Sequence, residues 1–393
     1  METPFRIEPT RLQSFSEELA NTVAEVMRIS TELSQRLNPA TAANLAELLR
    51  LTNSYYSNLI EGNVTRPRDI ERALAEQLDE NRRTRDLQRE AAAHVLVQRE
   101  IDELHARDQL GEPAATEFVR WIHRSFYEGA PEAMLRIKRA DGAEYSMLPG
   151  ELRRETFQDN IVGRHLPPSS SAVTAFMRYF ERQFCLAGVG AASKVVAIAI
   201  AHHRFNYIHP FPDGNGRVSR LMSHAMAHRA GIGAHGLWSI SRGLSRGLPT
   251  RPGYKAIMDA ADVPRASDLD GRGNLSLAAL VEFTQWFCDV MLDQLDFMSK
   301  ELEFDSLARR LATYVERDLG LPSTATAIAR DVLLRGEVPR GEATRITGLR
   351  DRAAREVLRQ LTSRGLLASA TPKGPVSLRI SAEAAETLFP RLF

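Results

Sequence analysis

The sequence predicts a mainly helical protein that ends in a small unit of helices and strands. Apolar residues recur at every third or fourth position over most of the chain, which is the period of an amphipathic helix. This pattern lapses between residues 145 and 168, where glycine and proline become frequent and a short β-hairpin is expected. After residue 340 the order of predicted elements becomes helix, turn, helix and an extended pair.

The length of the chain predicts more than one structural unit. At 393 residues it exceeds a typical single domain, so two or three cores are expected. We predict an N-terminal helical region over residues 1–110, a central helical domain over 111–304 and a third unit over 305–393.

Composition excludes few partners but does indicate a compartment. The formal net charge is only +1 and 26% of residues are charged, which excludes neither nucleic acid nor protein partners. Cys185 and Cys288 are too few for a disulfide framework or a thiolate metal site. Residues 1–10 lack the pattern of a signal peptide, and no apolar run is long enough to span a bilayer. We therefore expect a soluble cytoplasmic protein with no membrane partner.

The N-terminal region is predicted to be helical from about residue 12 to 107. A helix over about 52–62 carries Ser57 and Glu61 on one face and stops at Gly62. An ordinary helix end with an exposed glutamate has the same pattern. The following segment, 68–109, is rich in Glu, Arg, Gln and Ala, and its charges are interpreted as a solvated helix face.

The loop that follows His209 is built to hold an anion. Two prolines stiffen its backbone, and Gly214 and Gly216 permit conformations that are closed to other residues. The loop opens onto a second helix, so free backbone N–H groups and the positive end of the helix dipole face one space. This combination predicts a phosphate site.

Charged residues in and after the loop extend this prediction. Arg217 and Arg220 lie on one helix face and can both donate to the anion. Asp213 beside phosphate indicates a bridging Mg²⁺, and His209 can accept a proton near neutral pH. Taken singly, Asp213 also fits a helix N-cap and His209 a polar turn residue. Together they predict transfer of a phosphate-containing group to a hydroxyl.

The run from His209 to Arg220 resembles the signature of Fic-domain proteins, HxFx(D/E)GNGRxxR, at every defined position. The resemblance implies a Fic-type helical core and transfer of AMP from ATP to a Tyr, Thr or Ser hydroxyl of a protein. Phosphotransferring Doc-type relatives carry lysine where this chain has Gly216, which favours nucleotidyl transfer. The resemblance also implies a role for each residue. His209 is the general base, Asp213 binds Mg²⁺ and Phe211 anchors the loop. The phosphates are bound by Gly214, Asn215, Gly216, Arg217 and Arg220.

The helix that ends at Gly62 resembles the inhibitory motif of the same family, (S/T)xxxE(G/N). The resemblance implies that Glu61 pairs with Arg220 and blocks productive seating of the ATP γ-phosphate, with Ser57 as the first residue of the motif. The pairing could form within one chain or across a homodimer. Removal of AMP from a target, with Glu61 positioning a water molecule, is an alternative reaction for the same site.

The segment 150–168 is predicted to form the flap that covers a Fic site. Thr156, Phe157, Ile161 and Val162 are its expected extended residues, and the resemblance implies that a target protein adds along it as a strand. A surface loop would have the same glycine and proline content. Tyr254 is a candidate for contact with the adenine ring, with core packing as the alternative.

The third unit is predicted to be a winged helix-turn-helix. Its second helix presents Arg352, Arg355, Arg359 and Arg364 outward, which together with other basic residues of 340–380 suggests a DNA partner. Basic helices are also ordinary solvated faces, and winged helices also bind proteins. A DNA-binding regulator with a nucleotide-sensing or self-modifying Fic domain is therefore a further alternative.

Overall fold

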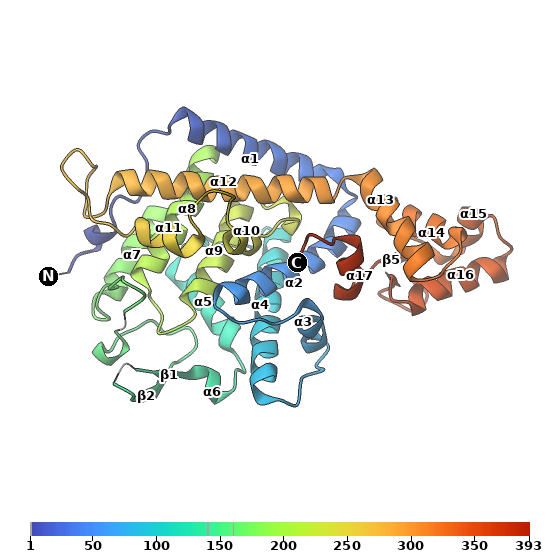
Figure 1. Cartoon of the computed structure of the whole chain (residues 1–393), viewed down its shortest axis with the longest axis horizontal. Coiled ribbons are helices and arrows are strands. Elements are labelled where there is room, and N and C mark those ends of the chain that lie inside the picture. Colours follow the sequence, from blue (N-terminus) through green and yellow to red (C-terminus); the bar gives the residue numbers. More distant parts are fainter. Residues whose placement is uncertain (1, 140, 160) are drawn as a thin grey trace.

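The computed structural model describes residues 2–139, 141–159 and 161–393. The prediction of a mainly helical chain is confirmed (Figure 1). The N-terminal part contains α1 (Glu17–Arg36), α2 (Pro39–Ile60), α3 (Pro67–Leu74) and α4 (Arg82–Ala106). The central part contains α5 (Thr116–Tyr127), α6 (Glu132–Leu135), α7 (Val173–Phe184), α8 (Ala191–Ile208), α9 (Asn215–Arg229), α10 (Ile240–Arg246), α11 (Tyr254–Ala260) and α12 (Leu277–Glu301).

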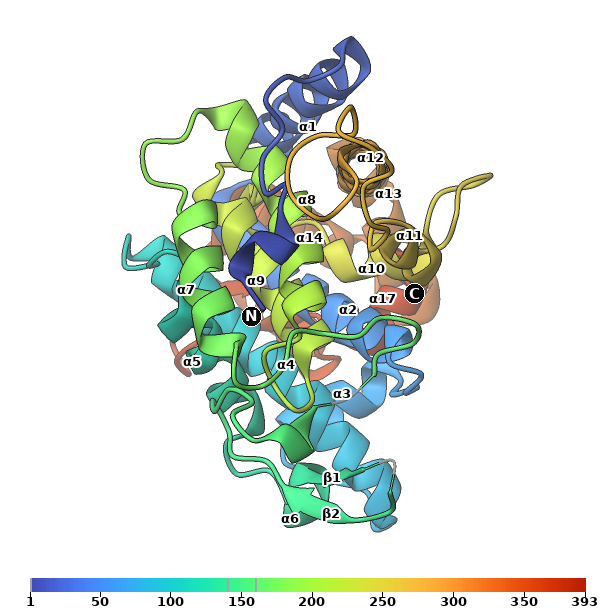
Figure 2. The same cartoon turned by 90° about the vertical axis from the view of Figure 1, so that its left-hand side faces the viewer.

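Local chemistry sets where the long helices begin. The hydroxyl of Ser16 accepts from the backbone of Leu19 at the start of α1, and Ser276 caps α12 in the same way. Asn38 caps α2, which has proline at its first position. The helices α1 and α12 pack along each other (Figure 1), and α8 runs through the interior (Figure 2). From Val195 onward most side chains of α8 are buried.

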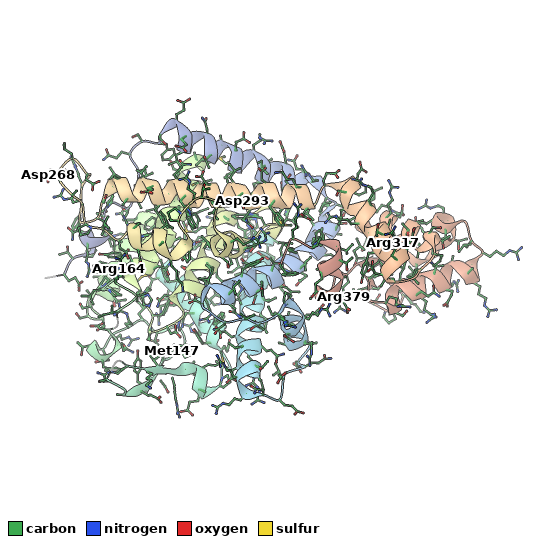
Figure 3. The ribbon with its side chains drawn as sticks, viewed as in Figure 1. Met147, Arg164, Asp268, Asp293, Arg317 and Arg379 are labelled. Carbon is green, nitrogen blue, oxygen red and sulfur yellow. The ribbon has the colours of Figure 1, made fainter. Side chains whose placement is uncertain are left out.

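Most of the C-terminal part lies at one end of the molecule, and its last helix packs back against α2 and α3 (Figure 1). Its helices are α13 (Phe304–Thr313), α14 (Ser323–Arg335), α15 (Ala343–Thr347), α16 (Asp351–Ser363) and α17 (Ala382–Leu388). Its strands are β3 (Glu337–Val338), β4 (Leu367–Ala368) and β5 (Val376–Leu378), which form an antiparallel sheet in the order β3-β5-β4. Helix, turn, helix and hairpin therefore occur in the predicted order. Figure 3 labels Arg317 and Arg379 at this end of the molecule and Asp268 at the opposite end.

The parts share a continuous interior. One connected set of buried apolar side chains extends from Ile7 to Leu392, and a smaller set lies between α2, α3 and α4. The C-terminal residues contribute to this continuity, because the hydroxyl of Tyr56 on α2 donates to the carbonyl of Leu392 at 3.2 Å. Arg242 on α10 donates to the carbonyls of Leu392 and Arg391 at 3.1 and 2.8 Å.

The predicted extended backbone at Thr156 and Phe157 is wrong. Both residues belong to a 3₁₀ turn over Thr156–Gln158, and a single bridge between Val162 and His165 is all the pairing between 150 and 168 in the described residues. The cause is Gln158, whose side-chain oxygen accepts from the backbone N–H groups of residues 154 and 155 and so closes the turn. The hairpin comes earlier, where β1 (Arg136–Lys138) pairs with β2 (Glu144–Ser146).

In the part of the chain that the structure describes, none of the helices combines the length and the apolar character that crossing a membrane requires.

Candidate functional site

The predicted anion loop connects two buried helices. His209 ends α8 with left-handed backbone angles (φ 50°, ψ 58°), and its N–H donates to the carbonyl of Phe205 at 3.0 Å. Gly214 precedes α9 with φ 78°, and a Cβ at this position would lie 2.8 Å from the hydroxyl oxygen of Tyr127. Glycine is therefore required at this point both by its backbone angles and by space.

Buried side chains hold the loop in shape. The Asn215 amide oxygen accepts from the N–H of Phe211 at 2.9 Å, and its amide nitrogen donates to the Phe211 carbonyl at 2.8 Å. The ring of Phe211 is fully buried and stacks on His123 with 4.1 Å between ring centroids. The side chain of Asn215 thus shapes the loop. The backbone N–H of Asn215 is at the first position of α9, where it has no partner within the helix and can bind an anion.

His123 ties the loop to the segment after β2. Its Nδ1 accepts from the N–H of Gly150 at 2.8 Å, so its Nε2 carries the proton and donates to the carbonyl of Asp213 at 3.2 Å. Burial lowers the pKa of His123 to about 4, and the ring is neutral at physiological pH. Sequence reasoning did not select this residue, because an isolated histidine in a helix carries no motif.

Arg153 is a second residue that the sequence did not reveal. Its buried guanidinium donates to the carbonyls of His209 and Pro168 at 2.8 and 2.9 Å, and it pairs with Asp159 at 2.7 Å. Its own N–H donates to the carbonyl of Pro210 at 2.8 Å. The segment 150–168 is therefore fastened directly to the backbone of the anion loop.

The imidazole of His209 is held in its neutral form. Burial is the largest cause of a pKa lowered to about 3, and the nearby charges of Arg153 and His165 act in the same direction. A neutral imidazole can accept a proton.

Glu61 and Ser57 meet Arg220 within one chain. The Arg220 guanidinium donates to Glu61 Oε1 at 2.6 Å and to the hydroxyl and carbonyl oxygens of Ser57 at 2.9 and 3.2 Å. Glu61 Oε1 also lies 2.5 Å from where a Cβ of Gly216 would be, so the carboxylate covers the first turn of α9. Burial alone would raise the pKa of Glu61, but the charges of Arg220, Arg217 and Lys255 outweigh it and the pKa is lowered.

A family comparison agrees with this geometry. Residues 113–227 match the model of the Fic/DOC family. The chain contains a Fic/DOC family domain. The resemblance carried by residues 209–220 is thereby confirmed.

The relatives of this Fic domain match over a short stretch. The protein adenylyltransferase Fic of Drosophila erecta and that of Drosophila melanogaster are each 39% identical over 82 residues, which is 21% of this chain and 16% of theirs. The match thus spans about a sixth of the length of these relatives.

Solved structures share the fold of the chain. A Fic family protein from Desulfovibrio desulfuricans G20 aligns over 96% of this chain and 98% of its own, with a TM-score of 0.54 and 15% identity. A Fic domain containing signaling protein from Bacteroides thetaiotaomicron aligns over 71% of this chain and 96% of its own, with a TM-score of 0.52 and 20% identity. At such low identity these matches show the fold alone.

The two arginines of the Fic loop have separate partners. Arg217 forms an ion pair with Glu90 on α4 and lies over the ring of Phe126, 5.5 Å from its centroid. Glu90 is buried, as are His94 and Gln98 on the same helix. The interpretation of 68–109 as a solvated charged face is wrong for this side of α4, because α4 packs against α9 and the charge of Arg217 needs a buried partner.

Asp213 has one carboxylate oxygen available. Its Oδ1 accepts from the N–H of Gly214 at 2.7 Å, and Oδ2 has no hydrogen-bond partner among the residues described. The side chain is exposed beside the first turn of α9. One free carboxylate oxygen next to the predicted phosphate site fits Mg²⁺, which is commonly bound by one or two carboxylates together with phosphate oxygens.

A pocket of about 420 Å³ opens over the Fic loop. Its lining joins His209, Gly216 and Arg220 with Glu61 at the end of α2 and Tyr254 of α11. Val162, Gly163 and His165 close another side, and Asp259 and Asp262 lie at its edge. The structure therefore brings five of the eleven predicted site residues into the lining of one cavity. The other six lie outside this lining: Ser57, Phe211, Asp213, Gly214, Asn215 and Arg217.

Tyr254 lines this pocket with its hydroxyl tied to the core. Ser223 donates to a backbone carbonyl at 2.8 Å and accepts from His202 Nδ1 at 2.9 Å, so His202 Nε2 accepts from the Tyr254 hydroxyl at 2.7 Å. The hydrogen bond to His202 fixes the hydroxyl edge of the half-buried Tyr254 ring. The face of the ring is therefore free to contact a ligand in the pocket.

Proposed function

We propose that the protein transfers AMP from ATP to a Ser, Thr or Tyr hydroxyl of a target protein, and that Glu61 restrains this activity. The observation that carries the proposal is the position of a neutral His209 at the rim of the same pocket as the first turn of α9. The names of the partial-length relatives, protein adenylyltransferase, support it.

Different residues of the site bind ATP and accept the proton of the target hydroxyl. The phosphates of ATP lie on the N–H groups at the start of α9, and Arg217 and Arg220 donate to them. The target hydroxyl gives its proton to His209, its oxygen bonds to the α-phosphorus, and the bond to the bridging oxygen breaks so that pyrophosphate leaves. A positioned general base contributes about 10²–10⁴-fold to such a rate.

Asp213 would hold Mg²⁺ through its free carboxylate oxygen. Bound there, the ion neutralises part of the charge on the phosphates. The remaining stabilisation comes from the helix N-terminus, which is in position before the substrate arrives, and from the arginines once they exchange their carboxylate partners for phosphate.

Glu61 would inhibit by occupying Arg220, one of the donors to phosphate. Its contact of 2.6 Å with Arg220 engages one terminal nitrogen of the guanidinium, and its negative charge lies where a phosphate would bind. Removing the carboxylate frees Arg220, so Glu61→Gly is expected to raise transfer well above the wild-type level.

The target would lie along residues 161–165. Val162 and Gly163 line the pocket, and Ile161 is 71% exposed beside them. An exposed apolar side chain next to the bridge between Val162 and His165 suits the capture of a peptide segment by its backbone.

The test is to incubate the full chain with ATP labelled at the α-phosphate and Mg²⁺, and to measure label on protein. We expect strong labelling by Glu61→Gly, weak labelling by wild type and none by His209→Ala. Glu76→Gly is the matched control, since Glu76 is an exposed glutamate just past the end of α3, and it should behave as wild type. AMP released from a labelled protein by wild type but not by Glu61→Gly would instead identify AMP removal.

We propose DNA as a partner of the C-terminal unit. Residues 340–380 contain nine arginines and lysines against three acidic residues. On α16, Arg355 and Arg359 are exposed and pair with acidic neighbours. Arg352 on this helix and Arg364 directly after it are also exposed. Such a basic surface on the second helix of a helix-turn-helix suits the DNA backbone.

Binding of the full chain to duplex DNA should weaken steeply as salt rises. The double variant Arg352→Ala/Arg364→Ala should bind more weakly and with a smaller salt dependence. Arg83→Ala/Arg89→Ala removes two exposed arginines of α4 and serves as the control. No binding at low salt would contradict this part of the proposal.

A further inference from the structure

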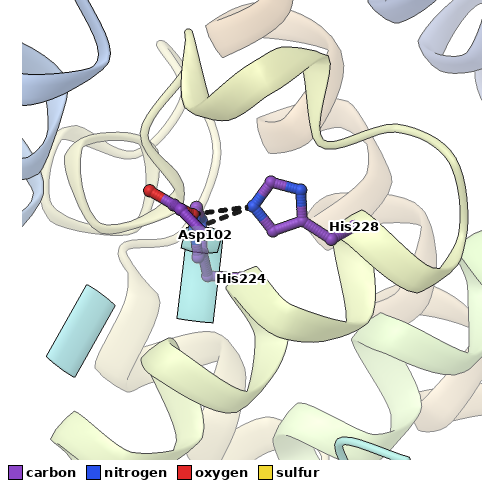
Figure 4. A group of neighbouring side chains, drawn as sticks. All are labelled: Asp102, His224 and His228. Carbon is purple, nitrogen blue, oxygen red and sulfur yellow. Dashed lines mark hydrogen bonds and ion pairs between the residues drawn. The ribbon is translucent and has the colours of Figure 1, made fainter. Parts of the chain in front are cut away.

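A second cluster of polar side chains lies at the far end of α9 from the anion loop (Figure 4). His224 and His228 are four residues apart on one face of this helix, and Asp102 comes from α4. His224 and His228 are buried. The adenylyl-transfer site uses none of these three residues.

The three side chains present one atom each to the same point. His224 Nε2 and His228 Nε2 lie 2.6 and 2.8 Å from Asp102 Oδ1, and the two nitrogens are 3.2 Å apart. Ligand atoms held at about 2.0–2.2 Å from a tetrahedral Zn²⁺ lie about 3.3 Å from one another. The nitrogen pair already has this separation, and the carboxylate needs to move by about half an ångström.

The surroundings of the cluster are those of a metal site. Arg50 donates to Asp102 Oδ2 at 2.7 Å, which turns Oδ1 toward the two imidazoles. Such an outer hydrogen bond orients a metal ligand.

One side of the cluster opens to solvent, where two further histidines, His105 and His235, are exposed. The exposed ring of His105 stacks on His228 with 4.4 Å between centroids. The turn that carries His235 lies over Asp102, because a Cβ on Gly236 would be 3.5 Å from Asp102 Oδ2. Four of the ten histidines of the chain therefore gather at this point, where an ion could enter and find a fourth ligand.

We propose that Asp102, His224 and His228 bind one divalent transition-metal ion of the Zn²⁺ class, with the fourth position open to water or His105. Nitrogen and carboxylate ligands at this spacing suit Zn²⁺ and Co²⁺ better than Mg²⁺, which prefers six oxygen ligands. The ion fastens α9 to α4 one helical turn beyond Arg220.

The test uses full-length protein without a histidine tag, stripped of metal with a chelator. Zn²⁺ and Co²⁺ are titrated separately by calorimetry, and bound metal is counted by mass spectrometry. We expect one equivalent of either ion, a Co²⁺ spectrum of tetrahedral type without thiolate bands, and displacement of Co²⁺ by Zn²⁺. Bound Zn²⁺ should also raise the Tm.

Variants assign the ligands. His224→Gln and His228→Gln should each lower affinity by at least about 100-fold, and Arg50→Gln by about 10–100-fold, as an outer-sphere change does. His165→Gln, outside the cluster, should leave affinity unchanged, and a loss in His105→Gln or His235→Gln identifies the fourth ligand. Metal that stays bound in the double variant His224→Gln/His228→Gln, or wild type that binds no ion at micromolar concentrations, overturns the proposal. If the variants fail to fold, the wild-type stoichiometry and Co²⁺ spectrum decide.

Discussion

At the scale of single residues, the site depends on side chains that hold backbone rather than substrate. Asn215 clamps both polar groups of Phe211, and Arg153 binds the carbonyl of His209. Each is buried, so its removal leaves hydrogen-bonding groups without partners.

Asn215→Ala should lower the free energy of unfolding by about 1–3 kcal/mol, because two buried backbone groups lose their partner. Urea denaturation measures this change. AMP transfer in the Glu61→Gly background should fall as well, since the loop loses its shape. A variant that is destabilised but transfers AMP at an undiminished rate would show that the clamp has no part in catalysis.

The pKa of His209 makes a prediction for acid pH. A histidine with a pKa of about 3 stays neutral above about pH 4, so kcat/KM for transfer should show no loss near pH 6.5 from protonation of the free enzyme. The Glu61→Gly variant should be assayed between pH 5 and 8. An acidic limb near pH 6.5 that is attributable to His209 would contradict the burial argument.

At the scale of elements, the anion loop could be predicted because its chemistry is local. Residues 209–220 lie within one loop and the next helical turns, so their spacing fixes which of them face one another. Arg153, His123 and Glu90 could not be predicted, since long-range packing alone brings them to the loop. The hairpin was misplaced because one side chain, Gln158, closes a turn that strand propensity cannot reveal.

Glu61 directly follows the last residue of α2, and this helix also contacts the C-terminal residues of the chain. Tyr56 donates to Leu392, and Arg242 binds the same carbonyl, with its guanidinium 3.7 Å from the centroid of Phe297. Breaking these contacts should loosen α2 and weaken the Glu61–Arg220 pair.

We therefore expect Arg242→Met to lower the Tm and to raise wild-type transfer part of the way toward that of Glu61→Gly. Labelling from ATP and a thermal melt on the same preparation measure the two effects. Arg251→Met, at an exposed arginine in the segment that follows α10, is the control and should change neither. A lower Tm with unchanged transfer would separate the C-terminal contacts from inhibition.

At the scale of the whole molecule, buried neutral histidines set the pH dependence of stability. Burial lowers the pKa to about 3 at His94, His202 and His209 and to about 4 at His123. In the unfolded chain these rings bind protons below about pH 6.5, whereas in the folded protein they do so only near pH 3–4. The unfolded state therefore gains protons first as pH falls.

Stability should be highest above about pH 6.5 and should decrease as the pH is lowered toward 4, by up to about 1.4 kcal/mol per pH unit for each such histidine. Carboxylates with lowered pKa values, such as Glu61, add to the loss below about pH 4.5. Thermal melts between pH 8 and 4 measure the trend. A Tm that rises between pH 6.5 and 5 would contradict the assignment of these rings as neutral.

The central claim is nucleotidyl transfer by His209 under restraint by Glu61. In the most direct measurement, the Glu61→Gly variant is incubated separately with ATP labelled at the α-phosphate and with ATP labelled at the γ-phosphate. The label on protein is measured in each case. The account predicts that only the α label moves to protein and that adding His209→Ala abolishes it. Transfer of the γ label, or of neither label while ATP is bound, would contradict it.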